Sequence, residues 1–147
     1  MAEAVLQHLV DQRPDAADWQ IDSCGTGAWH VGEPADKRTR AVLARAGIHY
    51  RGRARQLSDS DFVDFNWLLA MDEVNLAECQ ARRPAAAAVQ LALLRDFDPQ
   101  GRGPVPDPYY GGAHGFDDVY ELVERSCRAF IAQLGPELDP PQGQDAE

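Results

Sequence analysis

Two short apolar runs, separated by a polar stretch of helical length, constrain the fold of this chain most. Trp67 to Met71 and Val89 to Leu94 are both of strand length. Because neither run is interrupted by polar residues at a period of two, each is typical of a strand buried on both faces of a parallel sheet. Asp72 follows the first run and can cap a helix that reaches about Gln80. Strand, helix and strand in this order predict an α/β fold with a parallel sheet.

The rest of the chain fits the same architecture. The other predicted elements, in chain order, are a helix over 1–12, a strand over 19–24, a helix capped by Asp36 and ended by Gly47, a short helix with a capping-box-like start at Ser58, and a long amphipathic helix over 119–134. We expect one globular domain over residues 1–135. From Pro136 the chain consists almost entirely of Pro, Asp, Glu, Gln and Gly, so residues 136–147 are predicted to form a disordered acidic tail.

Composition excludes several functional classes. With 147 residues and 44% hydrophobic residues, the chain can bury a core, but no apolar run approaches the roughly 20 residues that span a bilayer. We therefore expect a cytoplasmic protein with no membrane partner. A formal charge of −10, with no basic stripe standing out against it, disfavours nucleic acid. Three widely spaced cysteines favour neither a disulfide framework nor a zinc site, and no cofactor or metal is expected.

The loop from Val105 to Gly112 contains the strongest catalytic candidate. Asp107 stands between two prolines, and each proline fixes its own φ and pushes the preceding residue toward extended geometry. The carboxylate is thus presented in a narrow range of directions, which suits a general acid that must lie within hydrogen-bond reach of a leaving atom. Taken alone, an Asp between prolines is more often an ordinary turn.

Several motifs carry a family resemblance. The matching segments are Met1 to Ala4, Asp22-Ser23-Cys24-Gly25-Thr26, Trp29 to Arg38, Ala70-Met71-Asp72, Pro106-Asp107-Pro108-Tyr109-Tyr110, and Gly115 to Phe130. In these segments the chain resembles the low-molecular-weight protein-tyrosine phosphatases. The resemblance implies a three-layer α/β/α fold and the hydrolysis of phosphotyrosine or similar phosphate monoesters through a cysteinyl-phosphate intermediate. The implied partner is a phosphotyrosine-containing protein or a small aryl phosphate. The related thioredoxin-coupled arsenate reductases share the fold, but the tyrosine pair fits the phosphatases better.

The resemblance also assigns roles to individual residues. Asp107 is implied to protonate the leaving phenolic oxygen and later to activate water. Trp29, Tyr109 and Tyr110 are implied to wall the pocket that binds the substrate ring, which agrees with the affinity of aromatic side chains for one another. Ser23 is implied to support the phosphate-binding loop by a hydrogen bond.

One essential part of the family pattern is absent from residues 1–147. The family binds phosphate in a Cys-x5-Arg loop that follows its first strand and immediately precedes the segment matched by Met1 to Ala4. Six residues after the three cysteines of this chain, Cys24, Cys79 and Cys127, stand His30, Ala85 and Gln133. Cys24 and Cys127 are expected to be small core residues. The first strand and the nucleophile are therefore predicted to be missing, and the chain as given is predicted to be inactive alone.

Three interpretations remain open. Met1 could be an internal methionine of a complete phosphatase. The chain could instead be a non-catalytic relative that binds phosphate or phosphotyrosine at the first-turn amides of its opening helix and its α-amino group. Finally, it could be a remnant that folds only when a partner strand fills the sheet, because about five buried aliphatic residues contribute on the order of 10 kcal/mol.

Overall fold

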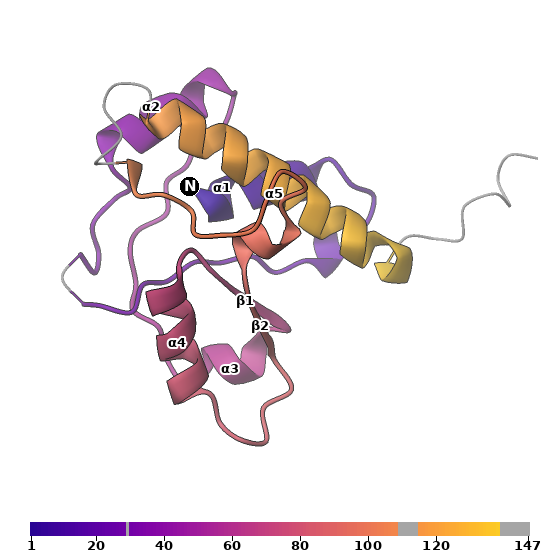
Figure 1. Ribbon diagram of the computed structural model, residues 1–147. Helices are drawn as coiled ribbons and strands as arrows, with labels where there is room; N and C mark the ends of the chain where they lie inside the picture. The colour runs from indigo at the N-terminus through magenta and orange to yellow at the C-terminus, as the bar shows by residue number, and fades with distance from the viewer. Residues whose placement is uncertain (29, 109–114, 139–147) are drawn as a thin grey trace, which may run out of the picture.

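The computed structural model describes residues 1–28, 30–108 and 115–138, and for residues 135–138 only the backbone. Its elements are α1 (Ala2–Asp11), the 3₁₀ helix η1 (Ala16–Asp18), α2 (Lys37–Arg45), α3 (Asp61–Asp64), β1 (Trp67–Ala70), α4 (Glu73–Arg82), β2 (Gln90–Leu93), the 3₁₀ helix η2 (Leu94–Phe97) and α5 (Gly115–Leu138) (Figure 1). Among the described residues, no helix is both long and apolar enough to cross a membrane.

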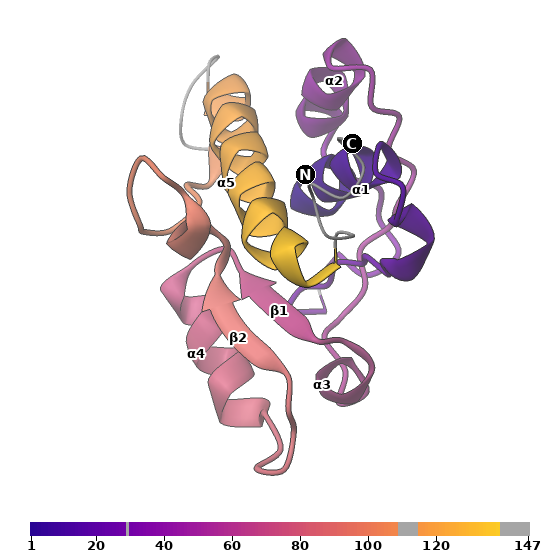
Figure 2. The same cartoon turned by 90° about the vertical axis from the view of Figure 1, so that its right-hand side faces the viewer.

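The predicted parallel sheet is confirmed. β1 and β2 pair in parallel, with Leu68 opposite Leu91 and Ala70 opposite Leu93. α4 packs against both strands, and α5 lies on the other side of the sheet (Figures 1 and 2). The result is a three-layer α/β/α fold whose sheet has two strands in the described part of the chain.

Alternate residues of β1 face two different clusters of apolar side chains, as expected for a strand covered on both faces. Leu69 packs on the main core, which is built chiefly from α1 and α5, whereas Leu68 packs on a second cluster around Phe62. The main core consists of Ala4, Val5, Leu9, Val10, Leu43, Ile48, Leu94, Val119, Val123, Cys127 and Ile131. Toward the end of α5, the Phe130 ring meets Trp67 edge-on at 5.5 Å between centroids.

The predicted caps Asp36 and Asp72 are confirmed as helix starts. The Asp36 side chain accepts a hydrogen bond from the Arg38 backbone N–H at 2.7 Å, and Asp72 accepts one from Asn75 at 2.8 Å. Both carboxylates thus satisfy N–H groups that have no partner within the helix. Gly47 follows α2 with a φ of 81°, a conformation that glycine adopts without steric cost.

The predicted strand over 19–24 is wrong. Within the described residues, the segment has no regular secondary structure, and only the following residue, Gly25, forms an isolated parallel bridge with Gln56. A strand requires a neighbour to accept and donate its backbone hydrogen bonds. β1 has β2 as its partner, and the described residues supply no strand between β1 and this segment.

Two helix predictions need smaller corrections. Ser58 does not cap the short helix, which starts at Asp61. Instead, the Asp61 carboxylate accepts from the Ser58 backbone N–H at 2.9 Å. α5 continues through Pro136 to Leu138, three residues into the predicted tail. The rest of the tail lies outside the described residues.

Candidate active site

The loop that carries Asp107 starts at the carboxyl end of β1. The Val105 backbone N–H donates to the Met71 carbonyl at 2.7 Å, one residue beyond the strand. Val105, Met71 and Met1 all pack against the main core. The general-acid candidate and the amino end of α1 are therefore anchored to the same cluster, at the edge of a parallel sheet where ligands normally bind.

A buried carboxylate fixes the loop before Asp107. The Asp98 side chain accepts from Arg125 of α5 at 2.7 and 3.0 Å, from Arg95 at 3.2 Å and from the Gln100 backbone N–H at 2.9 Å. The hydrogen bonds from Arg125 are the main reason why the pKa of Asp98 falls to about 2. Arg95 also donates to the Pro104 carbonyl at 3.1 Å, so the loop is tied to α5 and η2 just before it reaches Asp107.

The other end of the loop is fixed by a close backbone approach. Gly115 begins α5, and a Cβ at this position would lie 2.9 Å from the Pro108 carbonyl oxygen. Glycine therefore allows the loop to pass directly against the helix start. Asp107 itself is exposed to solvent.

Ser23 lies against the first turn of α1. Its hydroxyl donates to Glu3 Oε1 at 2.8 Å, and burial raises the pKa of Tyr50, whose hydroxyl is close to both residues. The α-amino group of Met1 is also largely buried, which lowers its pKa. Met1 precedes α1 without forming a side-chain cap.

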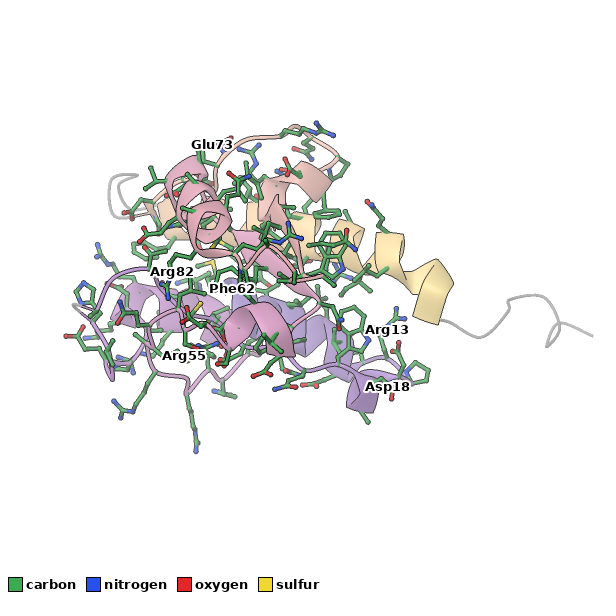
Figure 3. All side chains as sticks on the ribbon, turned by 90° about the horizontal axis from the view of Figure 1, so that it is seen from below. Arg13, Asp18, Arg55, Phe62, Glu73 and Arg82 are labelled. Atoms are coloured by element: carbon green, nitrogen blue, oxygen red, sulfur yellow. The ribbon has the colours of Figure 1, made fainter. Side chains whose placement is uncertain are left out.

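A second buried carboxylate holds the segment around Ser23. Arg55 donates to Asp61 at 3.0 and 2.9 Å and to Asp22 at 2.9 Å, so it joins the extended 19–24 segment to α3. Figure 3 shows Arg55, Phe62 and Arg82 on the same side of the molecule, next to α3. Burial alone would raise the pKa of Asp61, but hydrogen bonds from Arg55 and Ser58 outweigh burial and lower it.

The cysteines do not supply a reactive thiol. Cys127 is buried in the main core as predicted, and burial raises its pKa to about 12. The prediction that Cys24 is a core residue is wrong. Cys24 is exposed, because the 19–24 segment does not pair with the sheet. The pKa of Cys24 is nevertheless raised to about 11. The main cause is partial desolvation of the sulfur, and the second is the negative charge of Asp61. A thiol with such a pKa is protonated at neutral pH and is a poor nucleophile.

The structure places two of the five predicted site residues. Asp107 and Ser23 lie on the loops described above, whereas Trp29, Tyr109 and Tyr110 lie outside the described residues. A groove of about 350 Å³ between α3 and the loop after α4, lined by Phe62, Pro84 and Val89 among others, includes neither Asp107 nor Ser23. No group of three or more His, Cys, Asp or Glu residues in the described ranges could hold a metal ion.

Sequence reasoning missed the residues that support both site loops. Asp98 and Arg125 are 27 positions apart, and Asp22 and Arg55 are 33 apart. No local motif links such pairs. The only signal was the Asp-Pro dipeptide at 98–99 before the Asp107 loop.

Comparison with known proteins identifies the family of this chain. The chain matches the sequence model of "Low molecular weight phosphotyrosine protein phosphatase" over residues 1–139. A relative of that name from Schizosaccharomyces pombe is 44% identical over 129 residues, which cover 86% of this chain and 83% of the relative. The chain therefore belongs to the low-molecular-weight phosphotyrosine protein phosphatase family.

Solved structures agree with this assignment. A protein tyrosine phosphatase from Entamoeba histolytica superimposes with a TM-score of 0.86 at 33% identity, covering 92% of this chain and 88% of that one. An arginine phosphatase from Drosophila superimposes with a TM-score of 0.83 at 30% identity, covering 95% and 90%. The fold is thus shared by phosphatases whose names indicate different phosphorylated residues.

Proposed function

We propose that this chain contributes the general acid and the ring-binding pocket of a phosphotyrosine phosphatase. Asp107 is the general acid and base, Trp29, Tyr109 and Tyr110 bind the aryl ring, and Ser23 supports the phosphate-binding side. The observation that carries the proposal is the anchoring of the Pro-Asp-Pro loop at the carboxyl end of β1, in a chain that belongs to this phosphatase family. The predicted cytoplasmic location stays a prediction.

The chemistry requires a nucleophile in addition to these residues. A thiolate attacks phosphorus and the bond to the phenolic oxygen breaks, while Asp107 gives its proton to that oxygen. Water then attacks the phosphocysteine as Asp107 takes a proton from it, and the thiolate leaves. Residues 1–147 contain no Cys-x5-Arg sequence, and the pKa values of Cys24 and Cys127 are raised to about 11 and 12. We therefore expect the thiolate to come from a segment that is not among these residues.

Phosphotyrosine is the proposed substrate, ahead of phosphoarginine. Two adjacent tyrosines after the Pro-Asp-Pro motif, together with Trp29 of the 29–38 segment, suit a flat aromatic ester, because aromatic rings pack favourably edge-to-face or offset. The arginine phosphatase from Drosophila shows that phosphoarginine deserves a direct comparison in the assay.

The proposal is tested by adding the missing chemistry. The 147-residue chain alone should not hydrolyse p-nitrophenyl phosphate above buffer. A fusion that places an apolar strand and a Cys-x5-Arg loop directly before Met1 should hydrolyse it with burst kinetics, and a Cys→Ser version of the same fusion is the matched control. Burst kinetics from the chain alone, or a folded fusion without activity, would contradict the proposal.

A non-catalytic role in phosphotyrosine binding is the second candidate. It is favoured by the amino end of α1, where Met1 forms no side-chain cap and the first-turn amides are placed to bind an anion. The nearby Glu3 carboxylate opposes such binding. Calorimetry with a phosphotyrosine peptide separates the two functions, because a binding module gives heat of association without releasing phosphate.

A further inference from the structure

The strongly acidic composition conceals one basic segment. Residues 37–55 contain seven of the 14 lysine and arginine residues of the chain and none of its 24 acidic residues. The expectation that no basic stripe stands out is therefore wrong for this segment. Outside it, the other seven cations are distributed among all 24 carboxylates.

Three of the seven cations have structural partners. Arg38 pairs with Asp36 and also lies over the Phe116 ring, Arg45 pairs with Asp117, and Arg55 joins Asp22 to Asp61. These contacts fix α2 to the start of α5. They also reduce the net charge that the segment presents to solvent.

The remaining four cations are exposed, and within the described residues none of them forms an ion pair. They are Lys37, Arg40, Arg51 and Arg53, which we call the basic patch. Lys37 and Arg40 are three positions apart on the outer face of α2, whose other face buries Val42 and Leu43.

Two residues of the patch bind one and the same loop. Arg40 Nε donates to the Ala35 carbonyl at 3.1 Å, and Arg53 Nη1 donates to the Gly32 carbonyl at 2.9 Å. Carbonyls three residues apart are separated by no more than about 11 Å, so the two guanidinium groups lie on neighbouring parts of the loop. This loop belongs to the segment 29–38, one of the segments that carry the family resemblance.

The patch also adjoins the general-acid loop. α2 packs against α5, and the ring of Phe116 beneath Arg38 follows Gly115, which is in close contact with Pro108. Pro108 is the residue after Asp107. In Figure 1, α2 lies beside the start of α5.

We infer that the basic patch selects protein substrates in which acidic side chains flank the phosphorylated residue. The inference rests on the proposed function. An extended peptide rises about 3.3 Å per residue, so acidic side chains two to four positions from a phosphotyrosine at Asp107 lie about 7 to 13 Å from it along the surface. Glu33, which pairs with His30 on the same loop, and Asp118 oppose this attraction locally. Four cations without ion-pair partners outnumber these two carboxylates.

An acidic protein segment fits the patch better than nucleic acid does. A nucleic acid presents a phosphate charge at every step and needs a basic surface that continues along its length. Here the basic segment is bounded in sequence by Asp36 and Asp59, and the rest of the chain is strongly acidic. A short anionic stretch can bind the patch without running onto that acidic surface.

Fluorescence anisotropy with labelled peptides tests the inference on the 147-residue chain. Three peptides are compared at 50 mM and 300 mM NaCl: a phosphotyrosine peptide with acidic flanks, the same peptide with Asn and Gln flanks, and the acidic peptide without phosphate. We expect the acidic phosphopeptide to bind about 10-fold more tightly than the neutral one at low salt. The ratio should approach one at high salt, because screening weakens interactions between exposed charges.

Charge-matched variants locate the effect. Lys37→Gln combined with Arg51→Gln removes two patch cations for which the structure shows no side-chain hydrogen bond, and it should lower the preference for acidic flanks about 3- to 5-fold. The control, Arg83→Gln with Arg128→Gln, makes the same change in net charge elsewhere and should leave the preference unchanged. Patch-dependent binding of the acidic peptide without phosphate would also support the inference.

Other outcomes overturn the inference. Equal affinity for acidic and neutral phosphopeptides, equal loss in both double variants, or tighter patch-dependent binding of single-stranded RNA or anionic vesicles would each contradict it. The proposed function fails separately, if the folded Cys-x5-Arg fusion is inactive.

Discussion

The two sides of the candidate active site depend on different buried carboxylates. Asp98 supports the general-acid side, where its fully buried side chain is held by Arg95 and Arg125. Asp61 supports the Ser23 side, where its 5% exposed side chain is held by Arg55 alone among the arginines, and Arg55 is shared with Asp22. The Asp98 centre ties a long helix to the loop it supports, whereas the Asp61 centre ties an unpaired extended segment to one short helix.

This difference indicates how strongly each side of the site is coupled to the rest of the domain. The general-acid side is anchored by α5, β1 and the main core, and none of these anchors requires a further strand. The Ser23 side lacks strand pairing and depends on side-chain hydrogen bonds and one isolated bridge. We therefore expect changes at the first side to destabilise the whole domain and changes at the second to act locally.

Asp98→Ala should have the largest effect. It leaves Arg95 and Arg125 without their shared carboxylate and the Gln100 N–H without an acceptor, so the free energy of unfolding should fall by about 3 kcal/mol. Urea unfolding followed by circular dichroism measures the change. A loss below that of Asp61→Ala would reverse the ranking of the two sides.

Asp61→Ala should destabilise the domain less, by about 2 kcal/mol, because Arg55 is partly exposed and keeps Asp22 as a partner. Hydrogen exchange should increase mainly in residues 19–25 and 55–64. A uniform increase across α5 would show that the Ser23 side is coupled to the whole core.

Acidification should weaken the general-acid side. Because the pKa of Asp98 is lowered to about 2, its ionised form stabilises the folded protein at every pH above the ordinary carboxyl value near 4. This contribution, roughly 2 kcal/mol, should disappear progressively as the pH falls from about 4 to 2. In urea unfolding at several pH values, the free energy of unfolding of Asp98→Asn should fall less steeply in acid than that of the unsubstituted chain. An equally steep fall would exclude Asp98 as the titrating group.

Ser23→Ala should have the smallest effect on stability, within about 1 kcal/mol, because an exposed hydroxyl loses one hydrogen bond to Glu3. Glu3→Gln, which retains an acceptor for the hydroxyl, is the matched comparison. A loss as large as that of Asp61→Ala would mean that Ser23 organises more than the first turn of α1.

Elements whose signals are local could be predicted from the sequence. The runs that became β1 and β2 needed only apolar continuity, and the caps Asp36 and Asp72 needed only their own N–H partners two or three residues on. The alternation of apolar and polar residues from Trp19 to Cys24 is an equally local signal. A strand, however, also needs a neighbouring strand to complete its backbone hydrogen bonds. That dependence is not visible in the segment itself, and the prediction failed there.

The candidate site was predicted in part. Proline geometry and the family motif indicated Asp107, and the structure adds the Met71 and Pro108 contacts that hold its loop. The Asp98 and Arg55 centres could not be predicted, because their partners are brought together only by the completed fold. The concentration of cations in residues 37–55 can be read from the sequence, but the prediction considered only the total charge of −10.

The most direct test of the general-acid role compares two leaving groups in the fusion that carries the Cys-x5-Arg loop. Phenolate from phenyl phosphate is a more basic leaving group than p-nitrophenolate and depends more on protonation as it departs. Asp107→Asn should therefore lower kcat/KM for phenyl phosphate roughly 10²-fold or more and kcat/KM for p-nitrophenyl phosphate much less. An unchanged kcat/KM, or an equal loss of kcat/KM for both substrates, would contradict the assignment of Asp107 as the proton donor.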